Sequence, residues 1–320
     1  MTEQHRILVT GSSGFVGRWL MSALRDFPVD AGLELVSAGR GPDCDVDLDV
    51  VDKMAVTALL REVRPTAVVH LAAIAAPQEA RNAPSLAWSV NFHGTVNLAS
   101  AVLDQVPNSR FIFAGSAEAY GQSFADADGA ALLEDHALKP MTLYGATKAA
   151  ADIAVGQMSF DGLRSIRFRP FNHTGPGQAE SYVIPAFASQ IARIEAGIAP
   201  PVIEVGNLGA YRDFLDVRDV VQAYIFAALG RGEGADGKVF NLASGNAIEV
   251  REILDILVRM SGYDISIAIA PERVRPIDIP AARGDASAAQ RMFGWAPEFK
   301  LEDTINAVLL DWRERVNAAI

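Results

Sequence analysis

Short apolar runs alternate with longer segments of helical periodicity through the first two thirds of the chain. The runs are rich in β-branched residues and lack the polar alternation of a half-exposed strand, so they predict strands covered by helices on both faces. The predicted strands span residues 5–10, 33–38, 67–71, 110–114 and 163–169. The predicted helices between them span residues 14–26, 52–62, 86–105 and 144–158. This alternation predicts an α/β fold with a doubly wound parallel sheet of the Rossmann type.

After Arg169 the sequence becomes richer in loops with Gly and Pro. Helical periodicity continues in segments near residues 184–196, 217–229, 250–260 and 301–316. No clean linker separates the two parts of the chain. We therefore expect a dinucleotide-binding Rossmann domain over residues 1–170 and a smaller, interwoven C-terminal substrate lobe over residues 171–320. About residues 210–245 are expected to return to the first domain.

Composition narrows the class of protein without naming a reaction. With 320 residues, half of them hydrophobic, the chain can bury the core of a large domain and of a smaller lobe. The net charge of −11 argues against nucleic acid or an anionic membrane surface as a partner. A single cysteine, Cys44, excludes an internal disulfide framework and favours a reducing, cytoplasmic setting. No apolar run is long enough for a membrane helix, and the five histidines have no metal-ligand spacing, so we expect no metal site.

A glycine-rich segment joins the first predicted strand to the first predicted helix. Gly11 permits a tight turn, Gly14 lets the backbone approach a pyrophosphate, and Gly17 lets the helix pack closely on the sheet. The free N–H groups of the helix N-terminus suit phosphate oxygens. The spacing is GxxGxxG, and small residues also suit a strand-to-helix turn that binds nothing. Its place after the first strand favours cofactor binding by Gly11, Ser13, Gly14, Phe15, Val16 and Gly17.

The end of the second predicted strand bears on the choice of cofactor. Arg40 stands where an acidic residue would bind the ribose hydroxyls of NAD, and an arginine there suits the 2′-phosphate of NADP. The alternative is that Arg40 faces solvent. Asp49 and Val50 end a short third strand, where the carboxylate would accept from the adenine amine and the valine would cover the ring. A solvated loop aspartate is the alternative for Asp49. The expected cofactor is NADP(H), with NAD(H) as the alternative.

A tyrosine and a lysine four residues apart begin the helix predicted over residues 144–158. The spacing places Tyr144 and Lys148 on one helix face, one turn apart. A neighbouring ammonium favours the phenolate and is expected to lower the pKa of Tyr144, which makes it a usable acid or base near neutral pH. Ser116 follows a predicted strand at the sheet's carboxyl edge, where its hydroxyl can polarise a substrate carbonyl. A surface helix start would explain the Tyr–Lys pair alone, but not the ordered set of motifs.

Together these motifs resemble the extended short-chain dehydrogenase/reductase superfamily. The resemblance rests on the glycine loop, Ser116, the Tyr144–Lys148 pair, His70-Leu-Ala-Ala73 and Asn91-x-x-Gly94-Thr95. Further motifs resemble the nucleotide-sugar branch of that superfamily: Arg169-Pro-Phe-Asn172-His-Thr-Gly-Pro-Gly177, Val205-Gly-Asn207, Arg212-Asp-Phe-Leu-Asp-Val-Arg-Asp219 and Arg275-Pro-x-Asp-Ile-Pro280. Within the branch the chain is most similar to the GDP-4-keto-6-deoxy-D-mannose reductases, which form GDP-D-rhamnose. The GDP-mannose 4,6-dehydratases look similar too.

The resemblance implies roles for further residues. Leu71, Ala72, Ala73 and His173 are expected to lie against the cofactor, together with Tyr144 and Lys148. Asn172 is expected to contact the nucleotide phosphates, Val183 and Asn207 to line the nucleotide pocket, and Arg212 and Arg275 to clamp the diphosphate. An ion pair with Asp213 or Asp216 is the alternative for Arg212. The predicted helices at residues 86–105 and 144–158 are expected to pair with their copies in a four-helix homodimer interface.

The resemblance implies NAD(P)H-dependent reduction of the 4-keto group of a GDP-4-keto-6-deoxy-hexose. Tyr144 would donate the proton, Ser116 would orient the carbonyl, and Lys148 would hold the cofactor and the phenol. Glu118 matches the base that removes a proton in related dehydratases, so a 4,6-dehydratase is the alternative, as is a 4-epimerase. A non-catalytic, redox-sensing regulator is a remote alternative, because such proteins often lose the Tyr or the Lys.

Overall fold

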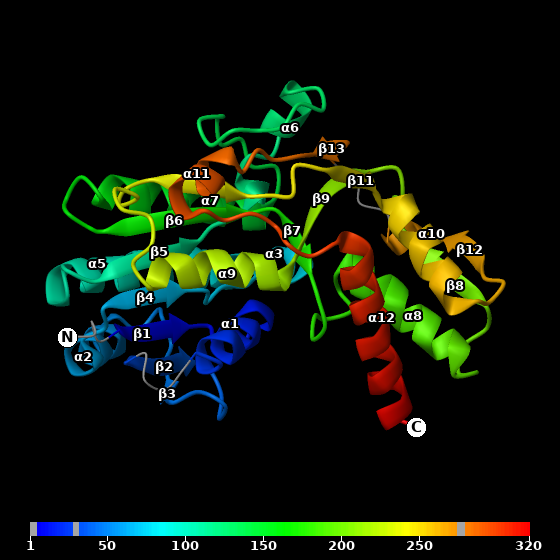
Figure 1. The fold of residues 1–320 in the computed structure, drawn as a ribbon, viewed down its shortest axis with the longest axis horizontal. Coiled ribbons are helices and arrows are strands. Elements are labelled where there is room, and N and C mark those ends of the chain that lie inside the picture. The colour runs from blue at the N-terminus through cyan, green and yellow to red at the C-terminus, as the bar shows by residue number, and fades with distance from the viewer. Residues whose placement is uncertain (1–4, 28–31, 274–278) are drawn as a thin grey trace.

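Seven parallel strands form the main sheet in the computed structural model, which describes residues 5–27, 32–273 and 279–320 (Figure 1). Their order across the sheet is β10-β6-β5-β4-β1-β2-β3, and every neighbouring pair is parallel. The strands are β1 His5–Thr10, β2 Leu33–Gly39, β3 Val46–Asp47, β4 Ala67–His70, β5 Arg110–Ala114, β6 Ser165–Pro170 and β10 Val239–Leu242. The chain order reverses between β1 and β4, which is where doubly wound sheets bind their ligands.

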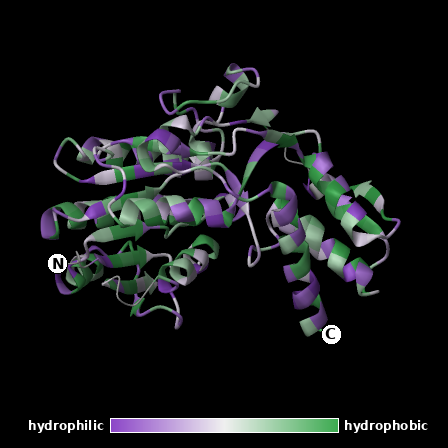
Figure 2. Ribbon diagram, in the orientation of Figure 1, coloured by the Kyte–Doolittle hydropathy of each residue, from purple (hydrophilic) through white to green (hydrophobic). Residues whose placement is uncertain are grey.

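Helices cover both faces of this sheet. On one face lie α1 (Phe15–Arg25), α9 (Val217–Ala228) and α11 (Ser287–Phe293); on the other lie α2 (Lys53–Val63), α5 (Thr95–Gln105) and α7 (Leu143–Met158). Strand β1 shows why its sequence is apolar throughout. Ile7 and Val9 enter the core beneath α1 and α9, whereas Leu8 enters the core on the opposite face. Figure 2 shows the same pattern as hydrophobic strands between helices of mixed polarity.

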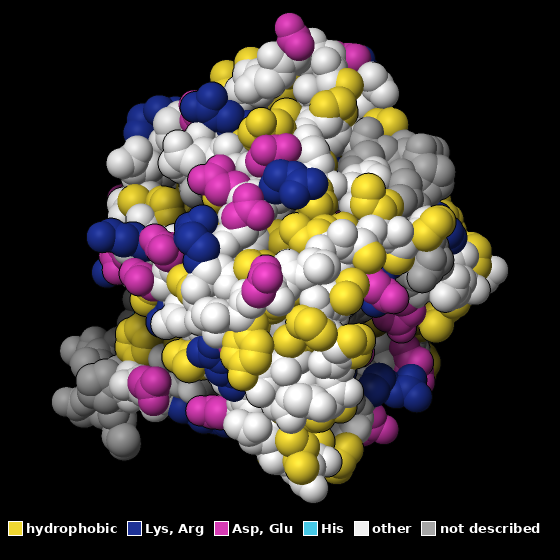
Figure 3. All heavy atoms as spheres, turned by 90° about the vertical axis from the view of Figure 1, so that its right-hand side faces the viewer, with side chains coloured by type: hydrophobic (Ala, Val, Ile, Leu, Met, Phe, Trp, Pro, Cys, Tyr) yellow, Lys and Arg dark blue, Asp and Glu magenta, His cyan; other side chains and the backbone are white. Residues whose placement is uncertain are grey.

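The C-terminal lobe packs around three helices, α8 (Val183–Glu195), α10 (Val250–Ser261) and α12 (Leu301–Ala318), with its own hydrophobic core (Figure 1). Strands β8 (Val202–Val205) and β12 (Ser266–Ile269) pair beside them. A small sheet connects the lobe to the main sheet and contains β7 Asn172–Thr174, β9 Tyr211–Asp216, β11 Ala247–Glu249 and β13 Ala281–Ala282. On the face of the lobe seen in Figure 3, apolar side chains are interspersed with charged ones.

The remaining elements are short. They are α3 Pro77–Asn82, α4 Pro84–Trp88, a π-helix η2 Ser89–Gly94, a 3₁₀ turn η3 Ala117–Ala119, α6 Ser123–Asp126 and a 3₁₀ turn η4 Pro271–Arg273. No helix that the structure describes is long and apolar enough to cross a membrane.

The parallel sheet and its alternating helices agree with the prediction from the sequence. The helix predicted over residues 86–105 differs, because α4, a π-helical stretch and α5 divide that segment. The predicted third strand is also shorter, since β3 ends at Asp47 rather than at Val50. The strands of the small sheet were missed: β7, β11 and β13 have only two or three residues and show no periodicity, whereas the six residues of β9 were recognised only as part of a motif. Strands β8, β10 and β12, of four residues each, were not predicted either. Strand β10 pairs with β6, so the chain re-enters the main sheet after β9; the division at residue 170 stays a prediction.

Candidate active site

A cavity of about 1010 Å³ lies between the carboxyl edge of the main sheet and the C-terminal lobe. Its lining comes from the segments that follow β1, β4, β5 and β6, and from the lobe. Twenty-one of the twenty-two predicted site residues line it: Gly11, Ser13, Gly14, Phe15, Val16, Gly17, Arg40, Asp49, Val50, Leu71, Ala72, Ala73, Ser116, Glu118, Tyr144, Lys148, Asn172, His173, Val183, Asn207 and Arg212. The remaining predicted residue, Arg275, lies outside the described residues.

The glycine loop has the geometry of an anion-binding turn. Gly11 has a φ of 72°, and a Cβ there would lie 2.6 Å from the backbone nitrogen of Ala72, so the turn and the close approach both require glycine. Helix α1 begins at Phe15 after Gly14, and no side chain caps it. Its first N–H groups are therefore left for phosphate oxygens, which fits the pyrophosphate of a dinucleotide.

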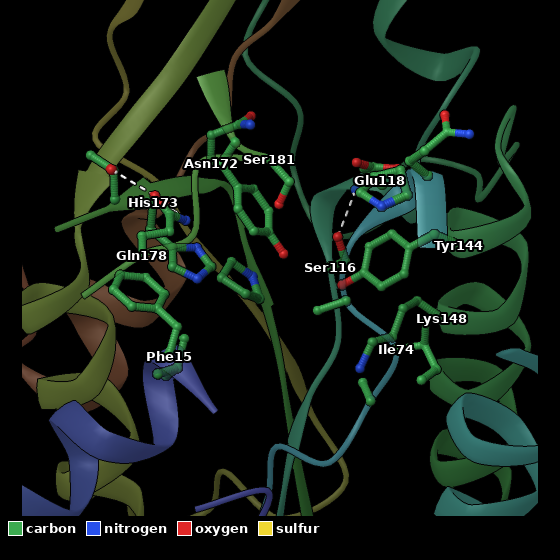
Figure 4. A pocket seen from close by; sticks show the side chains of 18 of the residues that line it. Phe15, Ile74, Ser116, Glu118, Tyr144, Lys148, Asn172, His173, Gln178 and Ser181 are labelled. Atoms are coloured by element: carbon green, nitrogen blue, oxygen red, sulfur yellow. Dashed lines mark hydrogen bonds between the residues drawn. The ribbon is translucent and has the colours of Figure 1, made fainter. Parts of the chain in front are cut away.

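The C-terminal lobe reaches back to this loop. Trp19 of α1 donates its indole N–H to the carbonyl of Pro176 at 2.9 Å, and Arg18 donates to the carbonyl of Gly177 at 3.1 Å. The rings of Phe15 and His173 are nearly parallel, with centroids 6.4 Å apart (Figure 4). Burial lowers the pKa of His173, so its ring is neutral near pH 7.

The adenosine end of the cavity contains an ion pair that the sequence did not predict. Arg40 Nη1 lies 2.7 Å from Asp49 Oδ2, and Arg40 Nε lies 4.0 Å from Asp47 Oδ1. Asp49 was expected to bind the adenine amine and Arg40 the 2′-phosphate of the cofactor. In the structure these two side chains bind each other. Val50 is buried, and its side chain packs where a Cβ at Gly94 would clash, which explains the glycine in the Asn91-x-x-Gly94 motif.

Local capping motifs position the catalytic side chains. Thr142 is the N-cap of α7 and accepts from the N–H of Gly145, which sets the start of the helix that carries Tyr144 and Lys148. Ser116 follows β5 and is the N-cap of the 3₁₀ turn η3. Ser116 and Tyr144 lie together on one wall of the cavity (Figure 4).

The protonation of Tyr144 departs from the expectation. Burial and the nearby charge of Glu118 raise the pKa of Tyr144, while the hydrogen bond from Ser116 lowers it less. Burial lowers the pKa of Lys148 to about 8, and its ammonium donates to the carbonyl of Ala114 at 2.8 Å. The sequence analysis expected Lys148 to lower the pKa of the phenol, whereas in the structure desolvation is the largest effect and raises that pKa. The phenol stays protonated and can act as a proton donor.

Glu118 lines the cavity beside the phenol, and its environment is specific. The hydroxyl of Thr142 donates to its Oε2 at 2.9 Å, and its backbone N–H donates to Ser116 Oγ at 3.1 Å. The carboxylate belongs to the same cluster as Ser116 and Tyr144. The geometry therefore leaves a carboxylate within reach of a substrate held against Tyr144.

The lobe supplies the other wall. Arg212 donates to the carbonyls of Tyr211 at 2.8 Å and Ile279 at 2.6 Å. Asp213 and Asp216 were the alternative partners for Arg212. Asp213 accepts from Ser244 and Gly245, and Asp216 caps α9 and binds Arg218. Arg212 nevertheless lines the cavity together with Asn172, Val183 and Asn207.

Sequence reasoning missed Thr142 and Tyr182. Thr142 contacts Glu118, and Tyr182 lines the cavity at the N-cap of α8. A polar residue just before a helix was the available signal for Thr142. His70 is buried at the end of β4, where the hydroxyls of Thr10 and Thr95 contact its two ring nitrogens at 2.7 and 2.9 Å, so its role is structural.

Comparisons with known proteins agree with this geometry. The model of the NAD dependent epimerase/dehydratase family matches residues 7–243. GDP-6-deoxy-D-mannose reductase of Pseudomonas aeruginosa is 33% identical over 97% of this chain and 98% of its own length. A structure of RMD from Pseudomonas aeruginosa complexed with NADPH has a TM-score of 0.86 and 31% identity over 98% of this chain and all of that one. UDP-glucose 4-epimerase of Thermus thermophilus, in complex with NAD, has a TM-score of 0.82 and 26% identity over 96% of this chain and 99% of that chain.

Proposed function

The chain belongs to the NAD-dependent epimerase/dehydratase family, and from that premise we propose that it reduces the 4-keto group of a GDP-4-keto-6-deoxy-hexose with NADPH. The product would be a GDP-6-deoxy-hexose of the rhamnose type. The similarity to GDP-6-deoxy-D-mannose reductase along nearly the whole chain supports this substrate. The observation that carries the reaction type is the half-buried Tyr144 beside Ser116 in the cavity, where desolvation raises the pKa of the phenol and favours its proton-donating form.

Tyr144, Ser116 and Lys148 have separate roles in the proposed reduction. When bound, NADPH supplies the hydride that C4 receives. Tyr144 gives its phenolic proton to the oxygen that becomes the C4 hydroxyl, so the carbonyl gains one hydride and one proton. Ser116 donates to the same oxygen and orients it. Lys148 holds the nicotinamide ribose and lies one turn along α7 from the phenol.

The rest of the cavity is assigned to the two nucleotides. Gly11, Ser13, Gly14, Phe15, Val16 and Gly17 would hold the cofactor phosphates, and Leu71, Ala72, Ala73 and His173 would lie against the cofactor. Asn172, Val183, Asn207 and Arg212 would bind the GDP moiety, as would Arg275 outside the described residues.

The proposed reduction can be assayed directly with the purified protein. The purified protein is mixed with NADPH and enzymatically made GDP-4-keto-6-deoxy-mannose. We expect NADPH to be consumed in equal amount with the keto sugar and a GDP-6-deoxyhexose to form. A protein that consumes no NADPH would contradict the proposal.

A second candidate function is the dehydration of GDP-mannose, and the position of Glu118 favours it. Its carboxylate lines the cavity beside Tyr144, where a base for the proton next to a keto group would stand. Loss of water from GDP-mannose in a parallel reaction, without added NADPH, would assign the chain to this activity.

Arg40 is expected to set the preference for NADPH. We predict that Arg40→Ser lowers kcat/KM for NADPH by about 10- to 100-fold, because one charge-assisted contact with the 2′-phosphate is lost. The value for NADH should change little. Initial rates with each cofactor measure both. Arg61→Ser is the control, because Arg61 lies on α2 outside the cavity and binds Gln105. Equal losses with NADH and NADPH would show that Arg40 does not bind the 2′-phosphate.

We also propose that the protein acts in the cytoplasm as a homodimer through α5 and α7. Ile153 on α7 is 62% exposed, and Phe160 just after it is 93% exposed, which suits a covered apolar face. Sedimentation equilibrium of the purified protein measures its mass, and cell fractionation its location. A monomer at micromolar concentration would contradict the dimer.

A further inference from the structure

Segment 172–178 contains β7 and the first residues of the loop that leads from it to α8, and it has two sides. Asn172, His173 and Gln178 near its two ends line the cavity, and Figure 4 shows them on the same wall. Residues 175–177 in its middle do not line the cavity. The ends of the segment therefore face the site, and its middle lies behind the cavity wall.

Helix α1 holds the middle of this segment from behind the cavity. Trp19 donates its indole N–H to the carbonyl of Pro176 at 2.9 Å. Arg18 donates through Nη2 to the carbonyl of Gly177 at 3.1 Å, and through Nη1 to the carbonyl of Ser13 at 2.6 Å. Neither Arg18 nor Trp19 lines the cavity, whereas Ser13 does. One guanidinium therefore joins the glycine loop to segment 172–178.

Helix α12 of the C-terminal lobe holds the same residue from the other side. Asp311 accepts from the N–H of Gly177 at 3.0 Å, and Arg315 forms an ion pair with Asp311 at 2.9 Å. Gly177 has a φ of 90°, and a Cβ there would lie 3.9 Å from Nη2 of both Arg18 and Arg315. The carbonyl of Gly177 is thus bound by α1 and its N–H by α12. None of the residues of α12 lines the cavity.

Internal contacts make segment 172–178 move as one piece. Gln178 donates to the carbonyl of His173 at 3.1 Å and accepts from the hydroxyl of Thr174 at 2.7 Å. A Cβ at Gly175 would lie 2.6 Å from Cγ1 of Val217, so the segment passes closely over the start of α9. A displacement at Gly177 is therefore transmitted to the end of the segment that faces the cavity.

We propose that Arg18 is a positioning residue that joins the glycine loop to the C-terminal lobe, so that a dinucleotide bound at the loop strengthens the binding of a nucleoside diphosphate in the lobe. This rests on the proposed function, which places NADPH at the glycine loop and the GDP moiety against Asn172 and the lobe.

The physical basis is the order that the first ligand establishes. Phosphate oxygens bound by the N–H groups of the glycine loop fix the position of Ser13, and with it one of the two partners of Arg18. The guanidinium then holds Gly177 in one place, and Asp311 extends that order to α12. Order that is already present need not be established again when the second ligand binds, so the two ligands bind cooperatively. The effect is reciprocal, since each ligand strengthens the other by the same factor.

The first test measures amide hydrogen exchange with and without saturating NADPH. NADPH should slow exchange in α1 and also, by about 5-fold or more, in α12. Because α12 does not line the cavity, direct contact with the cofactor cannot protect it. Arg18→Met removes both hydrogen bonds of the guanidinium and keeps a long side chain. It should preserve the slowing in α1 and lose the slowing in α12.

Arg25→Met is the matched control. Arg25 is an exposed arginine in the last turn of the same helix and lies outside the cavity, so its loss should leave the slowing in α12 unchanged. Asp311→Ala breaks the link on the side of the lobe, and it should abolish the slowing in α12 as Arg18→Met does. An α12 that NADPH does not slow in the unsubstituted chain, or slows equally in Arg18→Met, would overturn the inference.

The second test measures the coupling between the two ligands. Calorimetric titration with GDP should give a Kd about 5-fold or more lower with NADPH bound than without it, and Arg18→Met should reduce that factor to less than about 2-fold. An unchanged factor in Arg18→Met would contradict the inference. If GDP does not bind at all, the proposed substrate fails, and the exchange experiment, which needs only NADPH, still decides the role of Arg18.

Discussion

Tyr144→Phe is expected to lower kcat for reduction of the 4-keto sugar by about 10²- to 10⁴-fold, the usual contribution of a positioned general acid. The phenol lines the cavity beside Ser116, and Phe keeps the ring while it removes the hydroxyl proton that Tyr144 can donate. NADPH affinity should change little. Single-turnover absorbance measures the rate, and fluorescence titration measures cofactor binding.

Tyr263→Phe is the matched control, because Tyr263 is half exposed and lies outside the cavity. It should keep full activity. A Tyr144→Phe variant that retains more than about a tenth of kcat would mean that another group supplies the proton.

Asp152→Ala is expected to destabilise the fold by about 3–5 kcal/mol, because it leaves two buried guanidinium groups without their anion. Asp152 on α7 is 1% exposed. It accepts from Arg169 Nε at 2.9 Å, Arg169 Nη2 at 2.9 Å and Arg167 Nη1 at 2.8 Å. The carboxylate thus ties α7, which carries Tyr144 and Lys148, to β6. Urea denaturation measures the change in the free energy of unfolding.

Asp161→Ala is the control for this substitution. Asp161 lies just beyond the same helix and is exposed, and among the described residues its side chain accepts a hydrogen bond from Gln157 alone, so its loss should cost less than about 1 kcal/mol. An Asp152→Ala variant that loses no more stability than Asp161→Ala would show that the buried arginines find other partners or water.

Local motifs made much of the site predictable. Gly11 and Gly14 follow an apolar strand, and Tyr144 and Lys148 are one helical turn apart, so neighbouring residues alone define their geometry. Most strands of the main sheet were also predictable, because buried parallel strands give apolar runs. Strand β10 was missed.

The contacts between distant segments were not predictable in this way. Thr142 and Glu118 are 24 residues apart, and nothing in the intervening sequence specifies their hydrogen bond. The pairing of Arg40 with Asp49 depends on how β3 is placed beside β2. The direction of the Tyr144 pKa shift depends on burial, which the Tyr–Lys spacing does not record.

The most direct test of the central claim traces the transferred hydrogen. The protein is incubated with GDP-4-keto-6-deoxy-mannose and NADPH that carries deuterium at both C4 positions of its nicotinamide, and the product is examined by NMR. The account predicts one deuterium at C4 of a GDP-6-deoxyhexose for each NADPH oxidised. An unlabelled product, or no NADPH oxidation while GDP-mannose loses water in a parallel reaction, would contradict it.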